Sequence, residues 1–330
     1  MTQPLPASPP LRILVTGANG FVGRALCDTL QDAGHRVRAS VRTRKSADGL
    51  NTRELALTGN LDSTTHWQDA VQGIDTVVHL AARVHVMHET ADDPLAQFRA
   101  CNRDATANLA AAAAAAGVKR FVYVSTIKVN GEQTHGTPFR SDDTAAPSDP
   151  YGISKWEAEQ ELAKIAEKTG LEQVVIRPPL VYGPGVKGNF LRILGLIKRG
   201  APLPLGRLDN RRTLVGLHNL RDLIRRSIEH PDAGGHVFLA GDRQPVSTTD
   251  LTIAMAHALG RPARLFHIPD FITSAACALP PFQRIWQRLA GSLEVDISEA
   301  VRVLQWEPPR SMEDELREVA QWYAAHPADH

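Results

Sequence analysis

The chain has 330 residues, of which 43% are hydrophobic, so it is long enough to bury a full core. Its formal net charge of +1 gives no overall field that would favour nucleic acid or an anionic membrane surface as a partner. Its three cysteines lie far apart and show no metal-ligand spacing, which argues against a disulfide framework and a metal site and fits a cytoplasmic protein.

The N-terminal residues 1–10 are rich in proline and contain no apolar run. They are therefore predicted to be a disordered leader and not a signal peptide. No stretch of the chain reaches the ~20 consecutive apolar residues that cross a bilayer, so no membrane partner is expected.

From Leu11 onward, short apolar runs alternate with helical patterns. Helical spacing is clear over 21–33, and the run 110–116 consists of alanine, the best helix former. The strand-like runs are continuously apolar and separated by helices, so residues 11–177 are predicted to form a Rossmann-type, doubly wound parallel sheet of the α/β class. The predicted strands are 12–16, 36–41, 54–58, 76–80, 120–125 and 173–176.

The pattern changes after Pro178, where proline and glycine become frequent. Residues 178–330 are predicted to form a smaller, mixed α/β lobe that binds the substrate and could exchange segments with the first domain. Its predicted helices are 189–198, 219–229, 248–259, 298–304 and 312–323.

A glycine-rich turn follows the first predicted strand and opens the first predicted helix. Gly17, Gly20 and Gly23 have the spacing GxxGxxG, which permits a tight turn and lets a pyrophosphate approach the backbone. The start of the helix, with Phe21 and Val22, would face the phosphate charge. In this context the glycines predict a dinucleotide site, the alternative being an ordinary strand-to-helix turn.

The end of the second predicted strand indicates which dinucleotide is bound. A carboxylate there would bind the adenosine ribose of NAD, but the sequence continues as Ser40-Val-Arg-Thr-Arg-Lys45. A guanidinium suits the 2′-phosphate of NADP(H). NADP(H) is therefore favoured with Arg42 as its contact, and NAD(H) remains possible because these bases could instead form a solvated surface.

A tyrosine and a lysine four residues apart are predicted to share one face of a helix. Tyr151 is a poor acid–base at its ordinary pKa near ~10, and the ammonium of Lys155 would lower that pKa. Thr126 follows an earlier strand, where its hydroxyl could bind the same substrate oxygen as Tyr151. Together the three predict proton exchange with a hydroxyl group during hydride transfer.

With these motifs the chain resembles the extended short-chain dehydrogenase/reductase family, in its nucleotide-sugar epimerase, dehydratase and reductase branch. The resemblance covers nearly everything from Leu11 to Tyr323. It is carried by Gly17-Ala-Asn-Gly-Phe-Val-Gly23, His79-Leu-Ala-Ala82, Asn102, Val124-Ser-Thr126, Tyr151-Gly-Ile-Ser-Lys155 and Arg177-Pro-Pro-Leu-Val-Tyr-Gly-Pro-Gly185.

The resemblance implies a role for each matching position. Thr126, Tyr151 and Lys155 would form a catalytic triad, and Asn102 would support it. Further cofactor contacts would come from Asn60, Leu61, Leu80, Ala81, Ala82, Ser125, Pro178 and Val181. Contacts to a UDP-sugar would come from Arg83, Lys128, Asn189 and Arg212, with Arg211 as a rival. A homodimer through a helix pair that includes the Tyr151 helix is also implied.

Two histidines, His85 and His88, follow the fourth predicted strand and superficially resemble a metal pair. No third ligand is apparent and the family needs no metal. The stretch is therefore interpreted as a loop over the nicotinamide and the substrate.

Three functions remain open on the sequence. Lys128 and Asn130 resemble those of a bacterial surface-polysaccharide subgroup that contains UDP-glucose 4-epimerases and reductases of UDP-4-keto-6-deoxy-hexosamines. The basic end of the second strand favours the reductase, because NADPH is the usual supply of reducing equivalents. The alternatives are a UDP-hexose or UDP-N-acetylhexosamine 4-epimerase with retained NAD, and a non-catalytic dinucleotide sensor, against which the complete triad argues.

Overall fold

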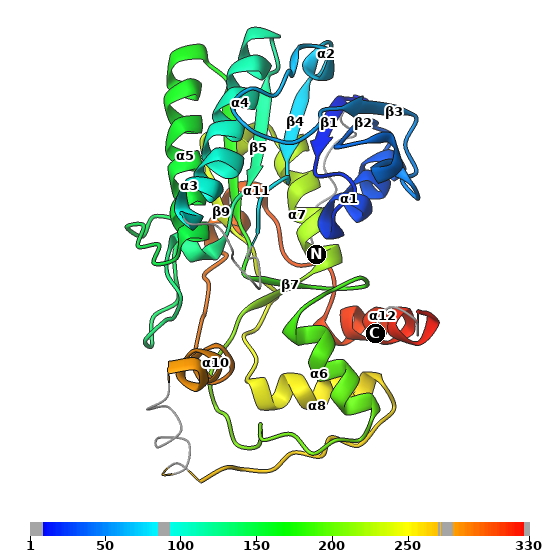
Figure 1. Cartoon of the computed structure of the whole chain (residues 1–330), viewed down its shortest axis with the longest axis vertical. Helices are drawn as coiled ribbons and strands as arrows, with labels where there is room; N and C mark the ends of the chain where they lie inside the picture. Colours follow the sequence, from blue (N-terminus) through cyan, green and yellow to red (C-terminus); the bar gives the residue numbers. More distant parts are fainter. Residues whose placement is uncertain (1–8, 85–92, 270, 272–279, 327–330) are drawn as a thin grey trace.

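The structure, a computed structural model, describes residues 9–84, 93–269, 271 and 280–326. Its centre is a seven-stranded sheet in which every neighbouring pair is parallel, in the order β3-β2-β1-β4-β5-β6-β9 (Figure 1). The Rossmann-type, doubly wound α/β fold predicted from the sequence is thereby confirmed. The strands are β1 (Arg12–Thr16), β2 (Arg36–Val41), β3 (Glu54–Leu57), β4 (Thr76–His79), β5 (Arg120–Val124), β6 (Glu172–Arg177) and β9 (Val237–Leu239).

Helices cover both faces of this sheet, and each face has its own core. On one face Ile13 and Val15 pack with Leu26 of α1 and Leu220 of α7. On the other face Leu14 and neighbouring strand residues pack with α4 and α5. The sheet is buried on both sides, which is why its strands read as continuous apolar runs. The helices of this part are α1 (Phe21–Asp32), α2 (Gln68–Val71), α3 (Pro94–Phe98), α4 (Ala105–Ala115), α5 (Pro150–Thr169), α7 (Leu217–Glu229) and α11 (Ser298–Leu304), with shorter turns η1 (Arg44–Ala47), η2 (Arg99–Asp104, a π-helix), η3 (Ile127–Val129) and η4 (Pro231–Ala233).

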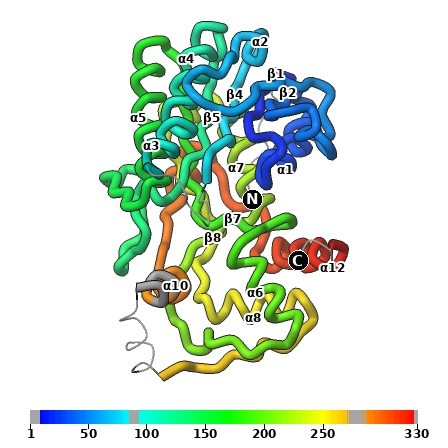
Figure 2. Tube along the Cα trace, in the orientation of Figure 1, coloured from blue at the N-terminus to red at the C-terminus, as the bar shows by residue number. Residues whose placement is uncertain are grey.

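A smaller group of elements lies at the carboxyl ends of the sheet strands (Figures 1 and 2). Its core is formed by Tyr182, Phe190, Leu194 and Met255 together with apolar residues of the last helix. The elements are β7 (Leu180–Tyr182), α6 (Asn189–Lys198), β8 (Leu214–Gly216), α8 (Thr248–Ala258), α10 (Pro280–Ala290) and α12 (Met312–Ala325), with β7 and β8 forming a two-stranded parallel sheet.

The chain crosses between the two groups more than once after Pro178. β7 belongs to the smaller group, α7 returns to the sheet, and β9 becomes the edge strand beside β6. The sequence did not predict β7, β8 or β9, because strands of three residues are too short to show a periodicity.

Candidate active site

The glycine turn after β1 is tight in the way a pyrophosphate site requires. Gly17 has a φ of +66°, and a Cβ atom there would lie 2.8 Å from the backbone nitrogen of Ala81. A Cβ atom on Gly23 would lie 2.1 Å from the carbonyl oxygen of Gly17. Gly20 is the N-cap of α1 and provides no side-chain cap. The first turn of α1 can therefore present its N–H groups and its partial positive charge to a phosphate.

The other predicted cofactor residues also lie along the carboxyl ends of the strands. Ala81 follows β4 and donates its N–H to the Thr16 hydroxyl at 3.3 Å. Pro178 follows β6 and accepts a hydrogen bond from the N–H of Ile127. Ser125 follows β5, and its buried hydroxyl finds no hydrogen-bond partner among the described residues. An orphaned hydroxyl beside a glycine cradle fits a ligand rich in polar atoms, as a dinucleotide is. Asn60, Leu61, Leu80, Ala82 and Val181 lie on the corresponding loops and on β7.

Arg42 follows directly after β2, at the position that the sequence analysis singled out. Its side chain is exposed, and its guanidinium forms no hydrogen bond or ion pair with the described residues. The segment from Arg42 to Ala47 carries no carboxylate. The group that would bind the adenosine ribose of NAD is thus absent from the end of β2.

Tyr151 and Thr126 come together at the start of α5. Asp149 caps this helix by accepting the N–H of Gly152 at 2.7 Å, and Pro150 opens its first turn, which places Tyr151 at the positive end of the helix. Burial and the Asp149 carboxylate raise the pKa of Tyr151 to about 12, and hydrogen bonding with the Thr126 side chain opposes this rise. Tyr151 therefore carries its proton at neutral pH.

Lys155 lies one turn further along α5 and is 1% exposed. Its Nζ donates a hydrogen bond to the carbonyl oxygen of Val124 at 2.8 Å. Burial lowers the pKa of Lys155 to about 7, against the opposing effect of the Glu159 carboxylate. The sequence analysis expected the pKa of Tyr151 to be lowered by Lys155. The pKa is raised instead, because burial of the phenol is the largest effect on it.

Asn102 forms hydrogen bonds with both α5 and the loop after β4. Its Nδ2 donates to the hydroxyl of Ser154 at 2.9 Å and to the carbonyl oxygen of Arg83 at 3.0 Å, while its Oδ1 accepts the N–H of Arg83 at 2.8 Å. The Ser154 hydroxyl in turn donates to the carbonyl oxygen of Tyr151. Asn102 is 1% exposed, so these hydrogen bonds are shielded from water and join the segment before α4 to the backbone of Tyr151 through Ser154.

A buried ion pair that the sequence analysis missed joins α5 to β6. Glu159 of α5 accepts two hydrogen bonds from Arg177 of β6, the shorter at 2.6 Å, and both side chains are 4% exposed. Arg177 also donates to Oδ1 of Asn130 at 2.9 Å. The only signal in the sequence was the position of Glu159 one helical turn after Lys155.

Among the predicted substrate contacts, Arg83 and Lys128 lie near the triad. The Arg83 guanidinium carbon lies 5.5 Å from the centroid of the Phe98 ring, whose other neighbour is the Tyr151 ring at 6.1 Å. Lys128 forms ion pairs with Asp149 at 2.5 Å and Glu132 at 2.9 Å. Although burial acts against it, these pairs raise the pKa of Lys128, which stays an ammonium.

Arg212 and Asn189 come from the smaller group of elements. Arg212 precedes β8, donates to the carbonyl oxygen of Gly291 at 2.7 Å, and has its pKa lowered by burial, with the Glu132 carboxylate acting in the opposite direction. The Glu132 carboxylate, which pairs with Lys128, therefore also acts electrostatically on Arg212. Asn189 is exposed at the first position of α6, and no contact joins it to Arg212 among the described residues. Arg211, the rival, turns to an ion pair with Glu294 at 2.8 Å.

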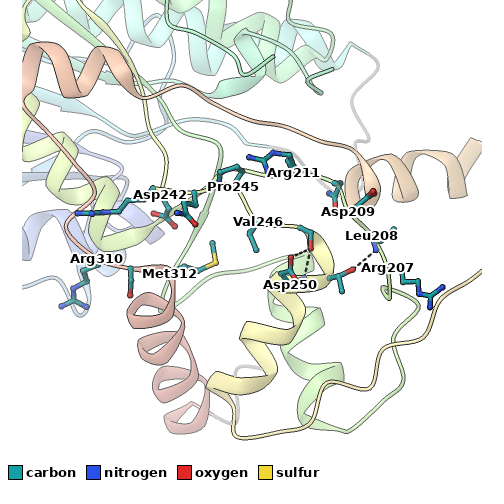
Figure 3. Close-up of a pocket in the computed structure, with 16 residues that line it drawn as sticks. Arg207, Leu208, Asp209, Arg211, Asp242, Pro245, Val246, Asp250, Arg310 and Met312 are labelled. Carbon is teal, nitrogen blue, oxygen red and sulfur yellow. Dashed lines mark hydrogen bonds between the residues drawn. The ribbon is translucent and has the colours of Figure 1, made fainter. Parts of the chain in front are cut away.

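A separate cavity of about 1000 Å³ opens between α8 and α12 in the smaller group (Figure 3). Arg207, Arg211, Asp250, Arg310 and other residues of three segments line it, but none of the triad does. His85 and His88 lie outside the described residues. No helix in the described part of the chain is long and apolar enough to span a membrane.

The parallel sheet, the glycine turn and the Thr126–Tyr151–Lys155 group define an NAD(P)-dependent enzyme of the extended short-chain dehydrogenase/reductase type. Residues 13–241 match the model of the NAD dependent epimerase/dehydratase family. The chain belongs to this family.

Relatives of known name agree with this assignment. A protein of Vibrio cholerae named UDP-glucose 4-epimerase is 40% identical over 316 residues, which are 94% of this chain and 95% of the relative. Two solved structures share the fold at lower identity. UDP-glucuronic acid 4-epimerase from Bacillus cereus, in complex with NAD, is 21% identical with a TM-score of 0.77 and covers 96% of this chain and 97% of its own. UDP-glucose 4-epimerase from Thermotoga maritima, with UDP-glucose, is 20% identical with a TM-score of 0.74 and covers 96% and 100%.

Proposed function

We propose that this protein catalyses NAD(P)-dependent hydride transfer at C4 of a nucleotide-linked hexose, and that UDP is the nucleotide. The observation that carries the proposal is that Tyr151, with Thr126 beside it and Lys155 one turn further along α5, lies at the same carboxyl-terminal edge of the sheet as the glycine turn. The relative at 40% identity supports a nucleotide sugar as the substrate class.

The chain's own groups would handle the proton and the position of the sugar. A bound nicotinamide cofactor would donate the hydride to a C4 ketone or accept it from a C4 alcohol. Tyr151 would pass its phenolic proton to the C4 oxygen, or take it back in the opposite direction. The Thr126 hydroxyl would donate a hydrogen bond to that oxygen as negative charge develops there. As an ammonium, Lys155 would offset part of the cost that burial imposes on the phenolate formed when Tyr151 gives up its proton.

For the direction, we propose reduction of a UDP-4-keto-6-deoxy-hexosamine by NADPH, a step of surface-polysaccharide synthesis in a bacterium. Arg42 favours NADPH over NADH, because its guanidinium could bind the 2′-phosphate. That guanidinium is exposed and unpaired among the described residues, and the end of β2 carries no carboxylate that would repel the phosphate.

The second candidate is a UDP-hexose or UDP-N-acetylhexosamine 4-epimerase with retained NAD. The name of the 40% identical relative favours it. Epimerisation must first remove a proton from the C4 hydroxyl, so it begins from the tyrosinate.

Four further residues would bind the parts of the substrate that do not react. Arg212 and Asn189 would bind the diphosphate and the nucleoside, and Arg83 and Lys128 would border the sugar. A cytoplasmic homodimer formed through α5 completes the proposal; light scattering of the purified protein tests the dimer.

One comparison on purified protein tests the function. Mixed with a UDP-4-keto-6-deoxy-hexosamine, the wild type should consume NADPH, and Tyr151→Phe should be at least about 10²-fold slower, since it has no proton to give. Arg42→Ala should raise the KM for NADPH about tenfold and leave that for NADH unchanged, because a charged hydrogen bond is worth about 1.5–3 kcal/mol.

Three outcomes would contradict the proposal at different levels. C4 inversion of UDP-glucose or UDP-N-acetylglucosamine without added cofactor, and no use of NADPH, would replace the reductase by the epimerase. Equal inactivity of the wild type and Tyr151→Phe towards every UDP-sugar, with intact dinucleotide binding, would favour a sensor. An unchanged KM for NADPH in Arg42→Ala would remove the cofactor argument.

A further inference from the structure

The ammonium of Lys155 has a second neighbour besides the Val124 carbonyl. Its Nζ lies 4.0 Å from the centroid of the Tyr123 ring, at the end of β5. Tyr123 is 0% exposed, and its buried hydroxyl interacts with the Thr106 side chain without reaching good hydrogen-bond geometry. A cation over an aromatic face is attracted by the ring quadrupole, and more strongly when both groups are out of water. The ring therefore acts on Lys155 through its face and not through its hydroxyl.

The Tyr123 ring also stacks on the ring of His79, the last residue of β4. The two rings are stacked, with centroids 5.7 Å apart and an interplanar angle of 21°. His79 is fully buried between two hydroxyls: its Nδ1 lies 2.6 Å from the Thr16 Oγ1 and its Nε2 lies 3.0 Å from the Thr106 Oγ1.

The hydrogen bonds leave His79 one tautomer. The Thr106 hydroxyl donates its single proton to the carbonyl oxygen of Asn102, so it can only accept from Nε2 of His79. Nδ1 must then accept from the hydroxyl of Thr16, which itself accepts the N–H of Ala81. Burial and the neighbouring Lys155 lower the pKa of His79 to about 3, so the imidazole stays neutral.

We propose that Tyr123 is a positioning residue whose ring face holds the Lys155 ammonium in the active site, with neutral His79 stacked on the same ring as a fixed support. This inference rests on the proposed function, because it assigns Tyr123 a part in the same chemistry. The arrangement needs a neutral imidazole, since an imidazolium stacked on the same ring would repel the ammonium.

The other charged or titratable groups around Lys155 are few in the described part of the chain. Glu159 lies one turn along α5 and is neutralised by Arg177, while the Tyr151 phenol lies one turn back and is uncharged at neutral pH. None of them offers a contact that could replace the ring. Removing the aromatic face should therefore make the ammonium less stable.

The decisive measurement is the titration of Lys155 itself, followed by NMR of the protein labelled with ¹³Cε-lysine. Lys155→Met identifies the resonance. Tyr123→Leu should lower the midpoint by about one pH unit, because a buried cation–π contact is worth ~1–2 kcal/mol and one pKa unit is about 1.4 kcal/mol. Tyr123→Phe keeps the aromatic face and should titrate like the wild type.

Trp67→Leu is the matched control, because Trp67 is also an aromatic residue that is 0% exposed and packs in the same core. It creates a similar cavity without touching Lys155, so it should lower the thermal midpoint of unfolding and leave the Lys155 titration unchanged. If Tyr123→Leu does not fold, Tyr123→Met takes its place in the Lys155 titration, because its flexible side chain fills similar space without an aromatic face.

The same shift should appear in turnover. In the variants without an aromatic ring at position 123, the alkaline limb of the pH–kcat profile should move to lower pH by a similar amount. A wild-type midpoint in Tyr123→Leu or Tyr123→Met would overturn the inference, and so would a Tyr123→Phe variant that shifts as far as Tyr123→Leu. Failure of the wild type to turn over any UDP-sugar would instead sink the proposed function, since the NMR titration needs no turnover.

Discussion

At the scale of single residues, burial decides the protonation states around the triad. Tyr151, Lys155 and His79 all lie out of water, and burial disfavours the charged form of each, so the pKa of the phenol rises and those of the lysine and histidine fall. The resting site therefore holds a phenol, a neutral imidazole and a lysine that changes charge near neutral pH.

Thr126 is the residue whose contribution can be isolated most simply. Thr126→Ala removes the hydroxyl that would bind the C4 oxygen, and kcat should fall about 10²-fold with little change in KM, because the bond strengthens as charge develops. Thr126→Ser keeps the hydroxyl and should remain within about tenfold of the wild type. Steady-state kinetics with the substrate of the wild type measures both, and an alanine variant as fast as the serine variant would remove Thr126 from the triad.

At the scale of secondary-structure elements, α5 is the part on which the site depends. Asp149 caps its start, Asn102 holds Ser154 from the neighbouring helix, and Glu159 binds Arg177 of β6. The cap and the contacts to two neighbouring elements, η2 and β6, fix the rotation of α5, and with it the direction of the Tyr151 and Lys155 side chains.

The buried pair between Glu159 and Arg177 should dominate the stability of this arrangement. Glu159→Gln leaves the guanidinium buried without a counter-charge, so the free energy of unfolding should fall by about 3–5 kcal/mol. Glu161→Gln on the same helix removes an exposed pair with Lys164 and should cost less than about 1 kcal/mol. Urea denaturation of both variants gives the comparison; equal losses would show that the buried pair has no special role.

At the scale of the whole molecule, α12 links the C-terminal end of the chain to the sheet helices. Glu315 of α12 is 0% exposed, and its Oε1 accepts the N–H groups of His218 and Asn219 in the first turn of α7. Its Oε2 is buried without a partner among the described residues. Burial and the nearby Asp242 raise the pKa of Glu315 to about 7.

This carboxyl group should make stability depend on pH. Its pKa is raised in the folded protein, so the folded state holds the proton more tightly than the unfolded state between about pH 4.5 and 7. The free energy of unfolding should therefore fall across this window, on the order of 2–3 kcal/mol from Glu315 alone.

Glu315→Gln should lose that part of the pH dependence. Chemical denaturation from pH 5 to pH 8 should show the variant gaining stability relative to the wild type as the pH rises. A constant difference between the two proteins over this range would mean that Glu315 does not titrate there.

The sequence by itself determined the sheet and the glycine turn and singled out Thr126, Tyr151 and Lys155, because each of these depends on a local pattern. Six parallel strands appear as continuous apolar runs, the glycine spacing is complete within seven residues, and Tyr151 and Lys155 are one helical turn apart. The predicted α6 and α11 agree with the structure at both ends.

Only the tertiary structure decided what surrounds those residues. The edge position of β9, the pairing of Glu159 with Arg177 and the stack of Lys155, Tyr123 and His79 all join residues far apart in the sequence. The sequence analysis expected a lowered pKa for Tyr151, whereas burial raises it, because this burial also comes from residues far apart in the sequence. A pKa depends on the water and charge around a group, and these are set when distant segments pack together.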